Sequence, residues 1–140
     1  MKKILIVIIT LLIVLSCKKE KPPTGNYIGV FHYQYISTVA DKSILFKIAE
    51  SKKDFFIFKT TDFMGNITNG SDTIFKNNNK INGRIHVIDG AQTSYQISGE
   101  LSKKRFKRTY LMKGTFTSTS YYQGGVLQIQ NSGTFEIKSN

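Results

Sequence analysis

Hydrophobic and polar residues alternate with a period of two along most of the chain after residue 25. In residues 126–138 the odd positions are mostly apolar and the even positions are mostly polar. Residues 80–88, 93–101 and 109–116 show the same alternation. Because successive side chains of a β-strand point to opposite faces of the sheet, each stretch predicts a strand with one buried face.

Four shorter segments upstream complete the predicted sheet: residues 26–36, 43–50, 54–61 and 72–76. About eight strands joined by short connections predict a single all-β domain, in which an antiparallel meander runs up and down. We expect the meander to close into a barrel, because closure leaves no strand with a free edge. A two-layer sandwich is the alternative.

The lengths of the later connections agree with antiparallel pairing. Pairing about Ala91 sets Ile81 against Leu101, so that both buried faces fall on odd positions. The even-length loop 102–105 moves the buried face to even positions, and a two-residue turn at 123–124 moves it back. These three connections agree with the faces that the alternation assigns independently.

The chain begins Met1-Lys2-Lys3 and continues with an apolar run over residues 4–15. As a helix this run would span about 18 Å, which is short for a bilayer core of about 30 Å, so it predicts a signal peptide. The run ends in Val14-Leu15-Ser16-Cys17, which resembles the lipobox of bacterial lipoproteins. The resemblance implies cleavage before Cys17 and attachment of acyl chains, palmitate among them, to that residue.

The predicted organisation is therefore a signal peptide at residues 1–16, a lipidated Cys and tether at 17–24, and a β-barrel domain at 25–140. Lipidation explains why the chain has one cysteine only. Three lysines in the tether either contact anionic lipid or simply keep a flexible linker soluble. We expect the protein to lie in the cell envelope, anchored by lipid to the outer membrane and facing the periplasm.

Glycines recur at inward positions in the middle of the predicted strands, where barrels need sharp bends. They are Gly29, Gly83, Gly99, Gly114 and Gly133. In several strands the motif is Gly-x-aromatic, as in 114–116 and 133–135, and Gly25-Asn26-Tyr27-Ile28-Gly29 opens the first strand. These features resemble the small lipocalin-like lipoproteins of the Bacteroidetes. The resemblance implies an anchored barrel that binds a small hydrophobic ligand at its open end.

An eight-stranded barrel is either filled by its own side chains or wide enough for one small ligand. Both outcomes remain open from the sequence. The residues predicted to line a ligand site are Tyr95, Ile97, Tyr110, Met112, Phe116, Leu127, Ile129 and Phe135.

Charge adds a second hypothesis. The chain has 20 Lys and Arg against 9 Asp and Glu, a formal net charge of +11. The densest run contains Lys103, Lys104, Arg105, Lys107 and Arg108. Such a hairpin would suit an interaction or inhibitor protein that binds an acidic protein or glycan, or it is a solvated tip. Phe106 shares the even face of Tyr110, which predicts a core position. Nucleic acid is not expected as a partner of an exported protein.

No catalytic constellation is found in the sequence. His32 and His86 have no His or Cys neighbour at ligand spacing, so we expect no catalytic residue, no metal, no cofactor and no enzyme activity. His86 falls on a polar face and predicts a surface residue, whereas His32 is expected in the barrel wall.

One short modification signal remains. Asp72-Thr73-Ile74 resembles the three-residue O-glycosylation signal of exported Bacteroidetes proteins, with Thr73 as the acceptor. Pairing about Asn78 would set Phe75 against Ile81 and turn Thr73 inward.

Overall fold

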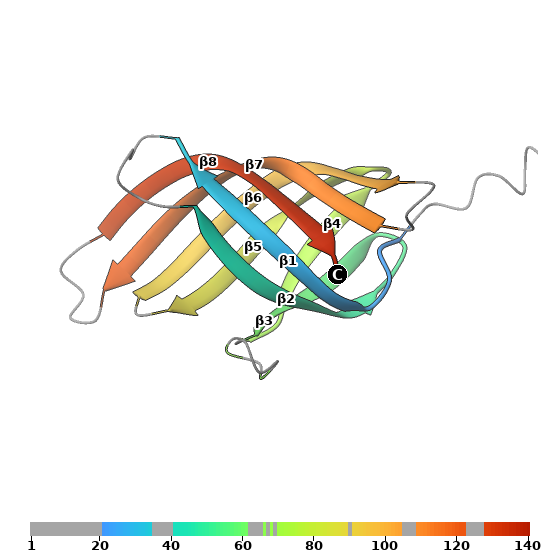
Figure 1. The fold of residues 1–140 in the computed structure, drawn as a ribbon, viewed down its shortest axis with the longest axis horizontal. Coiled ribbons are helices and arrows are strands. Elements are labelled where there is room, and N and C mark those ends of the chain that lie inside the picture. Colours follow the sequence, from blue (N-terminus) through green and yellow to red (C-terminus); the bar gives the residue numbers. More distant parts are fainter. Residues whose placement is uncertain are drawn as a thin grey trace, which may run out of the picture.

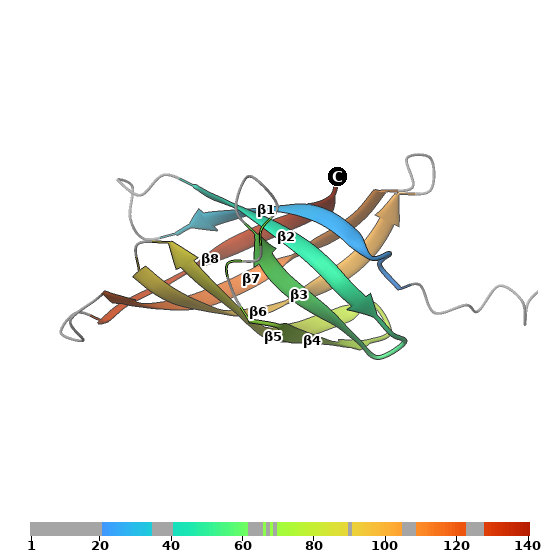
Figure 2. The same cartoon turned by 90° about the horizontal axis from the view of Figure 1, so that it is seen from below.

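A computed structural model of the chain describes residues 21–34, 41–61, 66, 68, 70–89, 91–104, 109–122 and 128–140. These residues form eight strands: β1 (Gly25–Tyr33), β2 (Lys42–Ser51), β3 (Phe55–Thr61), β4 (Asp72–Asn77), β5 (Lys80–Asp89), β6 (Ala91–Lys104), β7 (Thr109–Tyr122) and β8 (Gln128–Ser139). Each strand pairs antiparallel with the next, and β8 returns to β1 to close the barrel (Figures 1 and 2).

The predicted all-β meander and its closure are confirmed, and the sandwich alternative is excluded. Closure is made by the pairing of β1 with β8, in which Gly29 lies opposite Ile137 and Phe31 opposite Phe135. The predicted strands agree with the observed ones to within three residues, because apolar alternation marks where a strand has a buried face. The exception is β7, which continues six residues beyond the predicted end, and residues 102–104, predicted as loop, belong to β6.

Two predicted registers are wrong by two positions. Ile81 pairs with Gly99 and not with Leu101, because β5 and β6 continue pairing up to Asp89 and Ala91. Tyr121 pairs with Gln128, which a two-residue turn at 123–124 does not allow. A shift of two residues keeps every side chain on its predicted face, so alternation alone cannot detect it.

The predicted register of β4 with β5 is wrong by one position, and this error reverses the faces of β4. Asn77 pairs with Lys80 across a two-residue turn, in which Asn78 has a φ of 56°. Asn tolerates this left-handed conformation better than most residues. As a result Ile74 is buried, whereas Phe75 is 58% exposed and Thr73 points outward instead of inward.

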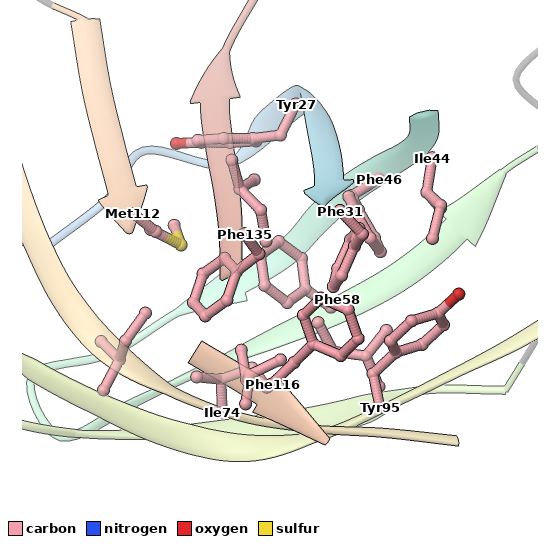
Figure 3. Close-up of a cluster of buried hydrophobic side chains, with 14 of the residues drawn as sticks. Tyr27, Phe31, Ile44, Phe46, Phe58, Ile74, Tyr95, Met112, Phe116 and Phe135 are labelled. Atoms are coloured by element: carbon pink, nitrogen blue, oxygen red, sulfur yellow. The ribbon is translucent and has the colours of Figure 1, made fainter. Parts of the chain in front are cut away.

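The core fills the middle of the barrel. Phe31 lies at its centre, with its ring centroid 4.6 Å from that of Tyr95, 5.3 Å from that of Phe116 and 6.0 Å from that of Phe135 (Figure 3). All four residues are almost completely buried. Packed aromatic rings therefore occupy the centre, and any ligand has to bind nearer to one end.

The recurring glycines are needed where neighbouring strands approach closely. Gly99 and Gly114 lie opposite each other in β6 and β7. A Cβ on Gly114 would overlap the carbonyl oxygen of Ser98 and the Cα of Gly99. Any side chain here would therefore force the two strands apart.

The two ends of the barrel are built from different connections. The tether end carries residues 21–24 before β1 and the connections β2–β3, β4–β5 and β6–β7. The distal end carries the connections β1–β2, β3–β4, β5–β6 and β7–β8. In Figure 1 the tether end lies at the right, where β1 begins, and the distal end lies at the left.

Candidate ligand site at the distal end

Inward-facing side chains at the distal end are rich in hydroxyl groups. Strand alternation places them on the inner face at the distal halves of their strands. The polar members are Tyr33, Lys42, Thr60, Asp72, Thr93, Tyr95, Ser118, Ser120 and Asn131, and the apolar ones are Ile44, Val87, Ala91 and Ile129. This composition differs from the aromatic centre of the barrel, and it suits a ligand that has both polar and apolar parts.

Most of these hydroxyl groups bond to each other across strands. The Tyr33 and Tyr95 hydroxyl oxygens lie 2.7 Å apart. Thr93 Oγ1 and Ser120 Oγ lie 2.9 Å apart, on the neighbouring strands β6 and β7. Such pairs fix the side chains in place, so the polar lining is preorganised.

Ser118 is the exception in this lining. Its residue is 3% exposed, and its Oγ has no hydrogen-bond partner among the described residues. It lies between Tyr95 on β6 and Asn131 on β8, directly opposite both. A buried hydroxyl without a partner destabilises a fold by about 1–3 kcal/mol. Ser118 therefore has hydrogen-bonding capacity that the described side chains do not use.

The predicted lining residues divide into three groups. Tyr95, Ile97, Met112, Phe116 and Phe135 are buried in the packed core. Tyr110 is half-buried near the tether end and Ile129 is half-buried at the distal end. Leu127 lies outside the described residues. Contact of any of them with a ligand stays a prediction, and only Tyr95 and Ile129 lie at the distal end.

Sequence reasoning identified Tyr95 but missed the other polar members of the site, because mainly apolar positions were predicted to line it. A signal was present: Ser118 and Ser120 share the even, inward positions of Met112 and Phe116 in β7. Polar residues at inward positions near a strand end indicate a polar mouth.

A hollow of about 530 Å³ lies against β7 and β8, but it is not the barrel mouth. Its described lining is Thr117–Thr119 and Gln130–Ser132, on two neighbouring strands. Four of these six residues point outward by strand alternation. The hollow is therefore a groove on the outer face.

Both histidines face acidic side chains. Backbone pairing between β4 and β5 stops at Ile74 and Gly83, so the carboxylate of Asp72 takes over beyond that point. Asp72 Oδ2 accepts a hydrogen bond from the His86 backbone N–H at 2.8 Å, and Asp72 Oδ1 lies 2.6 Å from His86 Nδ1. Asp72 thus completes the barrel wall where β4 begins.

His32 is exposed, and its Nδ1 lies 2.7 Å from Asp41 Oδ2. It points outward, so the prediction that it belongs to the barrel wall holds for its backbone only. In the described part of the chain no group of three His, Cys, Asp or Glu side chains is placed to hold a metal ion.

Several predicted site residues lie outside the residues that the structure describes. They are Cys17 and the rest of residues 1–20, the side chain of Lys104, and Arg105, Phe106, Lys107 and Arg108. Lys103 is described and exposed, with its Nζ 5.6 Å from the centroid of the Tyr110 ring. Binding of an acidic partner through 102–108 stays a prediction, as does glycosylation of the exposed Thr73.

The fold and this site define a closed, eight-stranded, up-and-down β-barrel with a hydroxyl-lined distal end. No family model matches the chain, and searches of curated proteins and of solved structures found no similar protein. Among the described residues, no helix is long and apolar enough to cross a membrane.

Proposed function

We propose that this protein is an exported lipoprotein, anchored through Cys17 to the periplasmic face of the outer membrane, whose barrel binds a small ligand at its distal end. The ligand has an apolar body and a polar group that hydrogen-bonds. The buried hydroxyl of Ser118, which has no hydrogen-bond partner among the described residues, is the observation that carries the proposal. Hydroxyl groups both donate and accept, so alcohols, amides and carboxylic acids all suit this position.

The packed centre limits the size and depth of the ligand. Phe31 and its neighbouring rings close the barrel below the distal end. Ile44 and Val87 are buried at the distal end and offer apolar contact for the body of the ligand. The site therefore suits a short apolar molecule, and it excludes a long acyl chain threaded along the barrel.

The test compares two serines whose Oγ atoms are both buried without a partner among the described residues, Ser118 at the distal end and Ser51 at the tether end. Protein purified from its own membrane is extracted with solvent, and the released small molecule is quantified by mass spectrometry. We expect Ser118→Ala to weaken retention about tenfold, the effect of one hydrogen bond of about 1.4 kcal/mol. Ser51→Ala is expected to retain as much ligand as the wild type.

Stability measurements separate binding from folding in the same variants. Removing an unpartnered buried hydroxyl should leave the ligand-free protein as stable as the wild type or slightly more stable. A wild-type protein that releases no small molecule, or equal retention by both variants, would contradict the proposed site.

The anchor is tested separately with Cys17→Ser. We expect this variant to lose membrane retention and to keep the fold, because the core lies wholly in the barrel strands. Detergent partition measures the loss. A Cys17→Ser protein that carries no acyl group and still stays with the membrane would exclude the lipoprotein proposal.

A further inference from the structure

Charge is distributed unequally between the two ends of the barrel. The tether-end connections between strands contain Lys52, Lys53, Arg105, Lys107 and Arg108 against one acid, Asp54. The distal-end connections contain no Lys or Arg, and they contain Asp41 and Asp62. The positive potential of this basic protein is therefore concentrated at the end from which the tether leaves.

Most of the described cations at the tether end are accessible, but Lys76 is buried. Lys21, Lys53, Lys80 and Lys103 are exposed, and we refer to them as the basic tether-end surface. The nearby Lys52 is also exposed and is paired with Glu50 at 3.1 Å. Glu100 lies opposite Lys80 in the β5–β6 pairing, yet it forms no ion pair with Lys80 among the described contacts.

An aromatic side chain stands exposed on the strand between those that lead to Lys53 and Lys80. Phe75 is 58% exposed on the outer face of β4, next to the turn that leads to Lys80. Phe55 lies directly opposite it on β3, next to the β2–β3 connection that contains Lys53. Exposed Phe surrounded by Lys is typical of surfaces that lie on the headgroup region of a bilayer.

The tether is held against this end of the barrel. Pro22 is buried, and the Tyr27 hydroxyl donates a hydrogen bond of 2.9 Å to the carbonyl oxygen of Pro23. Burial, and next the proximity of Tyr110, raises the pKa of Tyr27 above its ordinary value, so the hydroxyl keeps its proton. Only residues 18–21 separate the proposed acylated Cys17 from the buried Pro22, and the five steps from residue 17 to residue 22 reach at most about 18 Å.

We propose that the basic tether-end surface and Phe75 dock onto a membrane of anionic phospholipid, so that the distal end points away from the bilayer. The proposal rests on the proposed anchor at Cys17, which brings this end to the membrane. We infer anionic lipid as the partner from charge complementarity. The negative surface of such a membrane attracts basic residues that lie within a Debye length, about 8–10 Å. The orientation leaves the ligand site facing the aqueous compartment.

The absence of Trp from the chain allows a direct test. Phe75→Trp and Ile88→Trp each introduce one Trp at positions that are both 58% exposed, near the tether end and the distal end respectively. The lipidated proteins are incorporated through their acyl chains into vesicles of phosphatidylcholine, with or without about 30% phosphatidylglycerol. Lipids with a nitroxide quencher near the headgroup report which Trp lies at the membrane.

We expect quenching and a blue shift for Phe75→Trp in the anionic vesicles, and neither for Ile88→Trp. Adding Lys53→Glu and Lys80→Glu to Phe75→Trp should abolish the effect. Adding Lys47→Glu and Lys59→Glu makes the same charge change on the outer face midway along β2 and β3, and should leave the effect intact. High salt should also abolish it.

Equal quenching of both Trp residues, or quenching that does not depend on anionic lipid, would overturn the docking proposal. An acidic protein would then be the alternative partner of this surface. Flotation with the vesicles reports the anchor independently. A protein that floats but shows no quenching refutes docking alone, whereas one that does not float refutes the anchor on which both proposals depend.

Discussion

The tether end and the distal end share one barrel wall but differ in what their residues do. At the tether end the buried Tyr27 packs edge-to-face on Phe58, with ring centroids 6.5 Å apart, and the surrounding connections are basic. At the distal end, paired hydroxyls line the interior and the connections carry acids but no cations. The comparison shows a basic tether end above packed aromatic rings and a distal end lined by hydroxyl groups, and the proposed docking and the proposed ligand site depend on this difference.

Replacement of the central ring should produce the largest effect. We expect Phe31→Ala to lower the free energy of unfolding by about 3–5 kcal/mol, because it opens a cavity among four aromatic rings. Urea denaturation measures the loss. Phe75→Ala is the matched control on the outer face, and should change stability by about 0.5 kcal/mol or less. Equal losses in both variants would mean that the centre is not packed as described.

A smaller effect is expected from the paired hydroxyls of the distal end. Thr93→Val keeps the shape of the side chain and removes the hydrogen bond between Thr93 Oγ1 and Ser120 Oγ. The free energy of unfolding should fall by about 1 kcal/mol. The double variant with Ser120→Ala should lose less than the sum of the two single changes, since both remove one bond. Additive losses would show that the two hydroxyls do not interact.

The smallest effect concerns Glu136 on the outer face of β8. Hydrogen bonds from Lys113 and then Lys138 lower its pKa to about 2, from an ordinary value of 4.5. Because the folded pKa is the lower one, the stabilisation is complete above pH 4.5 and is lost as the pH falls toward 2. Its size should be only about 0.5 kcal/mol, since the lysines are exposed. Glu136→Gln should remove this part of the acid dependence, and an unchanged pH profile would refute the assignment.

Sequence periodicity predicted the strands and their buried faces because a buried face constrains every second residue. It could not determine registers beyond that parity, as the Ile81–Gly99 pair shows. It failed at β4 because the turn at Asn78 depends on one backbone conformation. A shift of one residue there buries Ile74 and exposes Phe75, the reverse of the predicted faces.

The distal site was the least predictable part. The Tyr33–Tyr95 contact joins residues 62 positions apart, and only the closed barrel brings them together. That Ser118 has no partner among the described residues is likewise visible only once the side chains around it are placed. Sequence alternation placed Tyr95 on an inward face, but it could not show which hydroxyl groups bond to each other.

Hydrogen exchange tests most directly whether the distal end binds the ligand. Protein purified from its membrane is compared before and after solvent extraction of the bound molecule and refolding. We predict faster exchange after extraction at Ala91–Tyr95 in β6 and at Ser118–Ser120 in β7, with Gly25–Tyr27 and Phe55–Phe56 at the tether end unchanged. Re-addition of the extract should restore the protection. Exchange that is unchanged at the distal end, or that changes only at the tether end, would contradict a distal ligand site.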